Sequence, residues 1–389
     1  MRFFGILPSL QLFLCVAIAA PSRAYVDWRN FKAVGVNLGG WLVQEKVLDA
    51  AFWNENGGTT TDEWDFCVRL GPQCGPVLER RYATFIRPAD IDKLANGGVN
   101  ILRIPTTYAA WVKVPGSQLY TGNQVDFLRN IATYAITKYN MHVIIDIHSL
   151  PGGINGLGIG EKDGNYNWFN NQTALEYSFR IIEAVAQFVQ SSGFPESYTI
   201  EPMNEPVDNR DFTKFGTPEA LSDNGAAWVA RYINGALSRV RAINPKIPVM
   251  FQGGFHTEPY WSHYFAADEN LVFDTHNYYF AGRPTTSANL PTFICGDAKA
   301  AAGDGKFPVF IGEWSIQAVN NNTFASRARN LNDGLYAWSK YTQGSTYWTA
   351  KFSGTDPVNG EGKQSDYWNY SAFIELGIMN PASSAGFCP

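Results

Sequence analysis

The sequence contains few charged residues, and its basic residues form no cluster. Asp, Glu, Lys and Arg make up 17% of the 389 residues, and the formal net charge is −5. Nucleic acids and other polyanions are recognised by patches of Lys and Arg side chains. The composition therefore argues against a nucleic-acid partner, and we predict none.

A long hydrophobic segment is also missing after residue 20. The N-terminus carries Arg2 and then an apolar stretch, residues 3–20, that ends in small residues. An apolar core this short, with no second span after it, is typical of a signal peptide rather than a membrane anchor. We predict a signal peptide over residues 1–20, with cleavage between Ala19 and Ala24. The mature chain, residues 25–389, would be secreted into the extracellular space.

Cysteine and histidine are scarce. The chain has five of each and no Cys-x-x-Cys pair, so a zinc or redox site is disfavoured. Cys15 lies in the predicted signal peptide, which leaves four cysteines. In a secreted chain an even number favours disulfides, and three connectivities are formally open. We favour Cys67–Cys74, which closes a small local loop, and Cys295–Cys388, which fastens the C-terminal tail.

Aromatic residues are abundant, at 15% of the chain with 12 Trp, 19 Tyr and 26 Phe. Aromatic faces stack on the apolar faces of sugar rings, but they also fill large cores, so this surplus favours a carbohydrate partner only slightly. Three Asn-x-Ser/Thr sequons without proline fit a secreted glycoprotein. They are Asn171, Asn321 and Asn369.

Short apolar runs alternate with longer segments of helical apolar spacing, which is typical of repeated βα units. We predict strands over residues 34–40, 100–105, 143–148, 198–204, 248–253, 272–277, 309–313 and 345–349. The clearest helices are 124–139, 173–191, 223–243 and 324–341, with Thr173 and Asp223 as N-caps. Eight such strands predict an α/β fold, a single-domain (β/α)8 TIM barrel. Its active face would lie at the strand ends, with long irregular loops over residues 150–170 and 280–303.

Side chains that could take part in catalysis lie where these strands end. Glu205 follows the fourth strand and Glu313 ends the seventh. Carboxylates at the C-terminal ends of two barrel strands point into one pocket, as a two-carboxylate glycosidase requires. The other residues at strand ends are Arg103, His148, Asn204, His276, Tyr278 and Trp348. Each of them alone would more often be structural, but together they predict one site.

These motifs resemble glycoside hydrolase family 5, and the match runs over essentially the whole mature chain. It rests on Asn204-Glu205-Pro206, Gly312-Glu313-Trp314, Arg103-Ile104-Pro105, Asp146-Ile147-His148 and His276-Asn277-Tyr278. The resemblance implies that Glu205 is the acid/base and Glu313 the nucleophile of a retaining hydrolase. It also implies substrate contacts from the six other strand-end residues, and it calls for no metal or cofactor.

The residues expected near Glu205 and Glu313 fit these two catalytic roles. Arg103 is expected to lower the pKa of Glu313, because a nearby cation favours a carboxylate's charged form. Tyr278 is expected to hydrogen-bond the same carboxylate, and Asn204 to bond the sugar 2-hydroxyl. Trp348 would form the floor of the pocket. Glu201, close to Glu205 in the sequence, is interpreted as buried or structural.

The opening segment, residues 35–42, resembles the fungal exo-β-1,3-glucanase branch of the family. Two segments depart from it: residues 148–156 (HSLPGGING) and residues 43–46 (VQEK). They resemble the related fungal rutinosidases, which release rutinose from flavonoid glycosides. We therefore predict a rutinosidase-type diglycosidase, with exo-β-1,3-glucanase as the alternative. Glu45 is a further candidate for binding sugar hydroxyls, with a surface salt bridge as an equal alternative.

Aromatic residues on the loops are candidates to line an aglycone site, although any one of them could equally anchor its own loop: Tyr166, Trp168, Phe169, Phe255, Tyr260, Trp261, Tyr279 and Phe280. Two other classes of protein remain open. A non-catalytic sugar-binding barrel would share the aromatics but would not need two supported carboxylates. A metal-dependent hydrolase would use His148, Asp146 and His276, yet it lacks the paired His-x-His expected of such a site. We expect a monomer whose partner is its carbohydrate substrate, a flavonoid diglycoside or a β-glucan.

Overall fold

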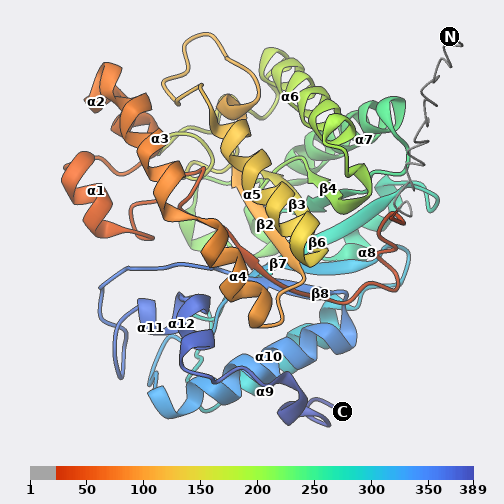
Figure 1. The fold of residues 1–389 in the computed structure, drawn as a ribbon. Helices are drawn as coiled ribbons and strands as arrows, with labels where there is room; N and C mark the ends of the chain where they lie inside the picture. Colours follow the sequence, from red (N-terminus) through yellow and green to blue (C-terminus); the bar gives the residue numbers. More distant parts are fainter. Residues whose placement is uncertain (1–22) are drawn as a thin grey trace, which may run out of the picture.

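The computed structural model describes residues 23–389, and the predicted signal peptide lies outside them. Eight parallel strands close into a barrel in sequence order, β1 to β8. Figure 1 shows the strands at the centre with helices around them. The strands are β1 Ala33–Asn37, β2 Ile101–Thr106, β3 His142–Ile147, β4 Tyr198–Glu201, β5 Val249–Gln252, β6 Leu271–Asn277, β7 Val309–Trp314 and β8 Gly344–Tyr347. The prediction of a (β/α)8 barrel is confirmed.

Helices follow each of the strands. They are α1 Ala50–Asn56, α2 Glu63–Leu70, α3 Cys74–Phe85, α4 Pro88–Asn96, α5 Gln124–Tyr139, α6 Gln172–Ser191, α7 Asp223–Ile243, α8 Glu258–Trp261, α9 Leu290–Ala301, α10 Arg327–Tyr341, α11 Ser365–Trp368 and α12 Tyr370–Glu375.

The predicted N-caps Thr173 and Asp223 were wrong. Asn171 caps α6 and Ser222 caps α7, because their side-chain oxygens accept the free backbone N–H groups of the first turn. The predicted irregular loop over residues 280–303 contains α9.

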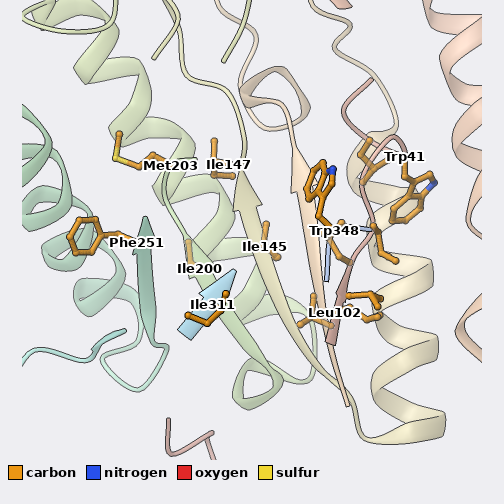
Figure 2. Packing of buried hydrophobic residues seen from close by; sticks show 14 of the residues in the cluster. Trp41, Leu102, Ile145, Ile147, Ile200, Met203, Phe251, Ile311 and Trp348 are labelled. Carbon is orange, nitrogen blue, oxygen red and sulfur yellow. The ribbon is translucent and has the colours of Figure 1, made fainter. Parts of the chain in front are cut away.

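Most of the apolar side chains pack between the strands and the surrounding helices. Strand residues such as Leu102, Ile145 and Ile200 point outward into this core, where helices cover them. Figure 2 shows these side chains with Phe251 and Ile311. Because both faces of a parallel barrel are covered, its strands are apolar almost throughout, which is why the sequence marks them so clearly.

A second, smaller apolar cluster fills one end of the barrel interior. Its members alternate along the strands with the outward-pointing core residues, as the two-residue period of a strand requires. It comprises Trp28, Ala33, Ile101, Ile144, Met250, Val272 and Phe310. All of its strand residues lie at or near the N-terminal ends of their strands. The interior at the opposite end is therefore left for polar side chains.

Two disulfides join the cysteine pairs that the sequence analysis favours. Cys67 bonds to Cys74, and Cys295 on α9 bonds to Cys388 beside the C-terminus, with Cα–Cα distances of 5.0 and 5.3 Å. Among residues 23–389, none of the helices combines the length and the apolar composition that crossing a membrane requires.

Candidate active site

Arg103 lies at the centre of the polar end of the barrel. It stands on β2 with no exposed side-chain surface, and its guanidinium faces three carboxylates. Nε lies 2.6 Å from Glu201, Nη2 lies 3.1 Å from Asp146 and Nη1 lies 2.7 Å from Glu313. A buried charge is tolerated only where it is paired and fully hydrogen-bonded. The planar fork of arginine meets that condition by reaching several strands at once.

Glu313 on β7 has three polar neighbours, Arg103, Tyr278 and His276. The Arg103 guanidinium contacts its Oε1, and the Tyr278 hydroxyl donates to its Oε2 at 2.7 Å. Burial alone would raise the pKa of Glu313, but the charges of His276 and Arg103 outweigh burial and lower it. An ionised, oriented carboxylate is the form that can act as a nucleophile.

Glu205 faces Glu313 across His276. The Nδ1 atom of His276 lies 2.7 Å from the Glu205 Oε1 and 3.5 Å from the Glu313 Oε2. One carboxylate oxygen from each glutamate and one His276 nitrogen all lie within 4.8 Å of one another. Retaining glycosidases hold their two carboxyl groups about 5–5.5 Å apart, whereas inverting enzymes need about 6.5–9.5 Å. This spacing is therefore compatible with double displacement.

The backbone at Glu205 is unusual. Its φ of +43° lies in the left-handed region, which residues other than glycine rarely adopt. The neighbouring β3 loop supports it, because the Asn155 amide donates to the Glu205 carbonyl and the Val207 N–H donates to Ile154. Strained backbone of this kind is found mainly where the surrounding structure fixes a functional side chain.

A register shift brings His276 opposite the nucleophile candidate. Along β6 and β7, Thr275 pairs with Ile311, but the next residue, His276, pairs with Glu313 and skips Gly312. Such irregularities redirect side chains, and they are common beside active sites. Gly312 is required here, since an added Cβ would lie 2.1 Å from the Asp274 carboxylate.

The strand ends of β3 and β6 share an Asp-x-His pattern. Asp146 accepts from His148 at 2.6 Å, and Asp274 accepts from His276 at 3.1 Å. Burial lowers the pKa of His276, but the carboxylates of Glu313 and Asp274 outweigh burial and raise it well above its ordinary value. Asp274 is a site residue that the sequence analysis missed. Its two-residue spacing from His276 on a strand was the available signal, because such residues share a face.

Asn37 on β1 was missed as well. Its Oδ1 accepts from Arg103 at 3.0 Å, and its Nδ2 donates to the Gly312 carbonyl at 2.8 Å. Glu201, the last residue of β4, is fully buried and paired with Arg103, which agrees with its interpretation as structural. β4 ends at Glu201, so Asn204 and Glu205 lie in the loop just after it rather than within or at the end of a longer strand.

His148, Asn204 and Trp348 form one side of the site. The Trp348 ring stacks on the His148 imidazole at 5.7 Å and 14°, and His148 Nε2 lies 3.4 Å from the Asn204 amide nitrogen. Asn204 Oδ1 also accepts from Arg103 at 2.8 Å, so this amide is fixed in orientation. Trp348 follows β8 and is only 5% exposed.

Glu45, which lies after β1, belongs to the same electrostatic environment. Burial raises the pKa of Glu45 to about 7, and the negative charges of Glu313 and Glu205 add to this effect while His148 opposes it. Its Oε1 is buried without a hydrogen-bond partner among the described residues. A buried acceptor without a partner is costly. A sugar hydroxyl would satisfy it.

Two groups of residues have the spacing of a metal site, and both include His276. One adds Glu201 and Asp274, and the other adds Glu205 and Glu313. In both groups the Arg103 guanidinium already bonds a carboxylate, and a cation in that position opposes a second cation. The metal set of His148, Asp146 and His276 considered from the sequence is not one of the groups found in residues 23–389.

Three of the aromatic residues considered for an aglycone site belong to the core instead. Trp168, Trp261 and Tyr279 are at most 1% exposed. Tyr166, Phe169, Phe255 and Tyr260 are half-buried, and Phe280 is 42% exposed. The sequence could not separate these groups, because burial of a loop aromatic depends on how the loops pack.

The three sequons differ in how the asparagine is used. Asn171 and Asn369 are helix N-caps whose amides also donate to backbone carbonyls, whereas the side chain of Asn321 is exposed. Occupancy of all three remains a prediction.

Comparisons with known proteins point to one family. Residues 76–354 match the family model described as Cellulase (glycosyl hydrolase family 5). A crystal structure of rutinosidase from Aspergillus niger is 57% identical, with a TM-score of 0.91, covering 92% of this chain and 100% of that one. A crystal structure of AoRut is 60% identical, with a TM-score of 0.91 and coverages of 92% and 99%. A probable glucan 1,3-beta-glucosidase A of Aspergillus clavatus is 30% identical over 79% of this chain and 72% of its own length.

Proposed function

Because the chain belongs to glycoside hydrolase family 5, we propose that it is a retaining diglycosidase of the rutinosidase type. It would release rutinose from flavonoid 6-O-α-L-rhamnosyl-β-D-glucosides. The observation that carries this proposal is the placement of Glu205 and Glu313 with carboxylate oxygens within 4.8 Å of each other. The choice of substrate is supported by 57–60% identity to the rutinosidase-type structures, against 30% for the glucan glucosidase.

The reaction would proceed in two displacements. Glu313, kept ionised by Arg103 and His276, attacks the anomeric carbon and forms a glycosyl ester, while Glu205 protonates the departing oxygen. Glu205 then removes a proton from the water that hydrolyses the ester. Glu313 loses its negative charge when the ester forms, but the Arg103 guanidinium is not left unpaired, because it keeps its contacts to Glu201 and Asp146.

The other side chains would bind and orient the sugar. Asn204, fixed by Arg103, would bond the 2-hydroxyl, a contact that strengthens in the oxocarbenium-like transition state. Trp348 would lie against one face of the reacting ring, and Glu45 would accept from hydroxyls.

Two substitutions test the catalytic pair. Glu313→Gln and Glu205→Gln keep the side-chain shape but remove the nucleophile and the proton donor, so each should lower hydrolysis by orders of magnitude in a folded protein. In an acid/base variant, azide replaces the deprotonated water of the second step and gives a glycosyl azide of retained configuration, whereas direct attack of azide in a nucleophile variant would give the inverted product. Rescue of Glu205→Gln on an activated aryl glycoside would therefore separate the two roles. Near-normal turnover by either variant contradicts the assignment.

The alternative is a glucan 1,3-β-glucosidase, the activity named for the Aspergillus clavatus relative. An assay of rutin against laminarin, with products identified, separates the two. Free rutinose supports the diglycosidase, and glucose from laminarin alone supports the alternative. A barrel that binds sugars without turning them over would give neither product.

We also propose that the mature chain, residues 25–389, is one secreted catalytic barrel that acts as a monomer. The two disulfides support an oxidising compartment. N-terminal sequencing of the secreted protein and its mass in solution test these points. A mature terminus far from residues 20–25, or a stable dimer, would contradict them.

A further inference from the structure

The loop after β4 carries an unusually exposed aromatic ring. Phe212 is 64% exposed, the highest value among the large apolar side chains exposed in residues 23–389. It lies on a short 3-10 helix, Phe212–Lys214, within the loop that follows Glu205. Its ring stacks on Phe215 at 5.7 Å and 27°, and Phe215 meets Phe255 edge to face at 5.1 Å and 62°. The three rings form a continuous row, called here the aromatic row.

The aromatic row lies on two loops that pack against each other close to the segment that carries the acid/base candidate. Gly254, next to Phe255, packs so closely on the loop after β4 that an added Cβ would lie 2.9 Å from the Pro206 carbonyl oxygen. Pro206 directly follows Glu205. The His256 imidazole also hydrogen-bonds the Leu221 carbonyl at 3.0 Å, which ties the loop after β5 to the loop after β4.

The backbone under Phe255 supports a functional role for its ring. Its φ of +66° lies in the left-handed region, where a bulky residue is an outlier. Conformations of this kind concentrate at active sites and ligand clamps. A Gly at this position would adopt the same backbone without strain, so the backbone conformation alone does not require a phenylalanine here.

The loop after β3 also contacts the loop that carries Phe212 and Phe215. The Arg210 guanidinium lies 5.5 Å from the centre of the Tyr166 ring, which belongs to the loop after β3. The loops after β3, β4 and β5 therefore meet on the Glu205 side of the site. The nucleophile side has its own aromatic group, in which Tyr278 stacks on Trp368 at 5.5 Å and Phe280 meets Trp368 at 5.3 Å.

We propose that Phe212, Phe215 and Phe255 form a platform for the planar aromatic part of the leaving group. The inference rests on the proposed function, because it takes Glu205 as the proton donor. A general acid must lie within hydrogen-bond reach of the leaving oxygen, so the leaving group departs on its side of the pocket. A flat polyphenol offers the face that stacks on exposed phenylalanine rings. A sugar acceptor or a small alcohol would gain less from these rings.

The test compares two rutinosides that share the glycone. Rutin carries the aromatic leaving group quercetin, whereas methyl β-rutinoside carries none. In Phe212→Ala, the ratio of kcat/KM for rutin to kcat/KM for methyl β-rutinoside should fall roughly two- to tenfold, the range of one aromatic pair. The inhibition constant of free quercetin should rise by a similar factor. Phe212→Tyr, which keeps the ring, should restore both values.

Phe324→Ala is the matched control. Phe324 is 44% exposed and stacks on Tyr367, away from the aromatic row. It should leave the ratio and the quercetin constant unchanged. Equal losses on both rutinosides, or no change in Phe212→Ala, would overturn the platform while the proposed function stands. A wild-type protein that releases no rutinose from rutin would overturn the proposed function itself, and the platform with it.

Discussion

Inside the barrel, the layer of side chains near the N-terminal strand ends is apolar, whereas the layer above it is ionised. Ile144 and Asp146 illustrate the change, because they lie two residues apart on β3 and share the inward face. The same step occurs on β2 from Ile101 to Arg103 and on β6 from Val272 to Asp274. The upper layer is as buried as the lower one, so exposure to solvent does not explain its charge.

The two layers differ in what makes the burial of their side chains favourable. The apolar layer is stabilised by removing carbon from water and needs no particular partner. In the ionised layer the side chains depend on one another, with Arg103 joining Asp146, Glu201 and Glu313. Burial nevertheless raises the pKa of Glu201 well above its ordinary value, although Arg103 opposes this effect. Such a network rarely stabilises more than apolar packing would. It is retained at the end where strands present side chains to the site, so its use is chemical rather than structural.

The largest effect is expected from removing the cation of the ionised layer. Arg103→Leu removes the cation that three buried carboxylates share. Breaking a buried pair in this way costs about 3–5 kcal/mol of folding free energy, and hydrolysis should be lost as well. Chemical unfolding and rutinose release measure the two effects. Arg103→Lys keeps the charge but cannot bond all three carboxylates, so it should be intermediate. A stable and active Arg103→Leu protein would show that the layer does not depend on this residue.

A pH-dependent effect of similar size is expected at Glu63, a buried carboxyl without a cation. One oxygen accepts from the Gln44 N–H at 2.8 Å, and the other has no partner among the described residues. Burial raises the pKa of Glu63 from 4.5 to about 8. A carboxyl whose folded pKa is raised contributes stability below its unfolded pKa and loses it as pH rises towards the folded value. The wild-type protein should therefore lose on the order of 4 kcal/mol between pH 4.5 and 8 from this group.

Glu63→Gln imitates the protonated carboxyl and should remove that part of the pH dependence. The variant would match the wild type near pH 4.5 and exceed it in stability at pH 8, as measured by urea unfolding across this range. Glu55→Gln, an exposed position on the neighbouring α1, is the control and should follow the wild-type profile. Parallel profiles for Glu63→Gln and the wild type would show that Glu63 is paired after all.

Much of this architecture could be predicted from the sequence. The strands are apolar because both of their faces are covered, and helices α5 and α7 begin and end at the predicted residues. Glu205 and Glu313 stand out because each follows or ends an apolar run. Features that depend on pairing between distant segments could not be predicted. The register shift that sets His276 opposite Glu313 has no local signal, since it is a property of two strands together.

The role of Asp274 was missed for a different reason. Its spacing from His276 was visible, but a buried Asp on an apolar strand is ambiguous until its partner is known. The loop aromatics were ambiguous in the same way, and three of them, Trp168, Trp261 and Tyr279, turn into the core. The sequence therefore identified the reactive residues more reliably than the residues that position them.

A smaller effect is expected from one hydrogen bond in the ionised layer. Tyr278→Phe removes the hydroxyl that donates to Glu313 at 2.7 Å but keeps the ring that stacks on Trp368. A hydrogen bond to a charged group contributes about 1.5–3 kcal/mol, so kcat/KM should fall about 10- to 100-fold. That hydroxyl also lowers the pKa of Glu313. The acidic limb of the pH–rate profile should therefore move to higher pH, because the nucleophile would ionise later.

The smallest effect is expected in the apolar layer, where the comparison can be made within one strand. Ile144→Val removes a single methylene from a fully buried site, which costs about 0.5–1.5 kcal/mol of stability. The turnover of the folded enzyme should stay at the wild-type value. Asp146→Asn, two residues along the same face, changes shape even less, yet it removes the carboxylate that pairs with both Arg103 and His148. Its turnover should fall and its pH–rate profile should shift. If Ile144→Val lowered turnover as much as Asp146→Asn did, catalysis would depend on packing throughout the barrel interior, and the two layers would not be separable in function.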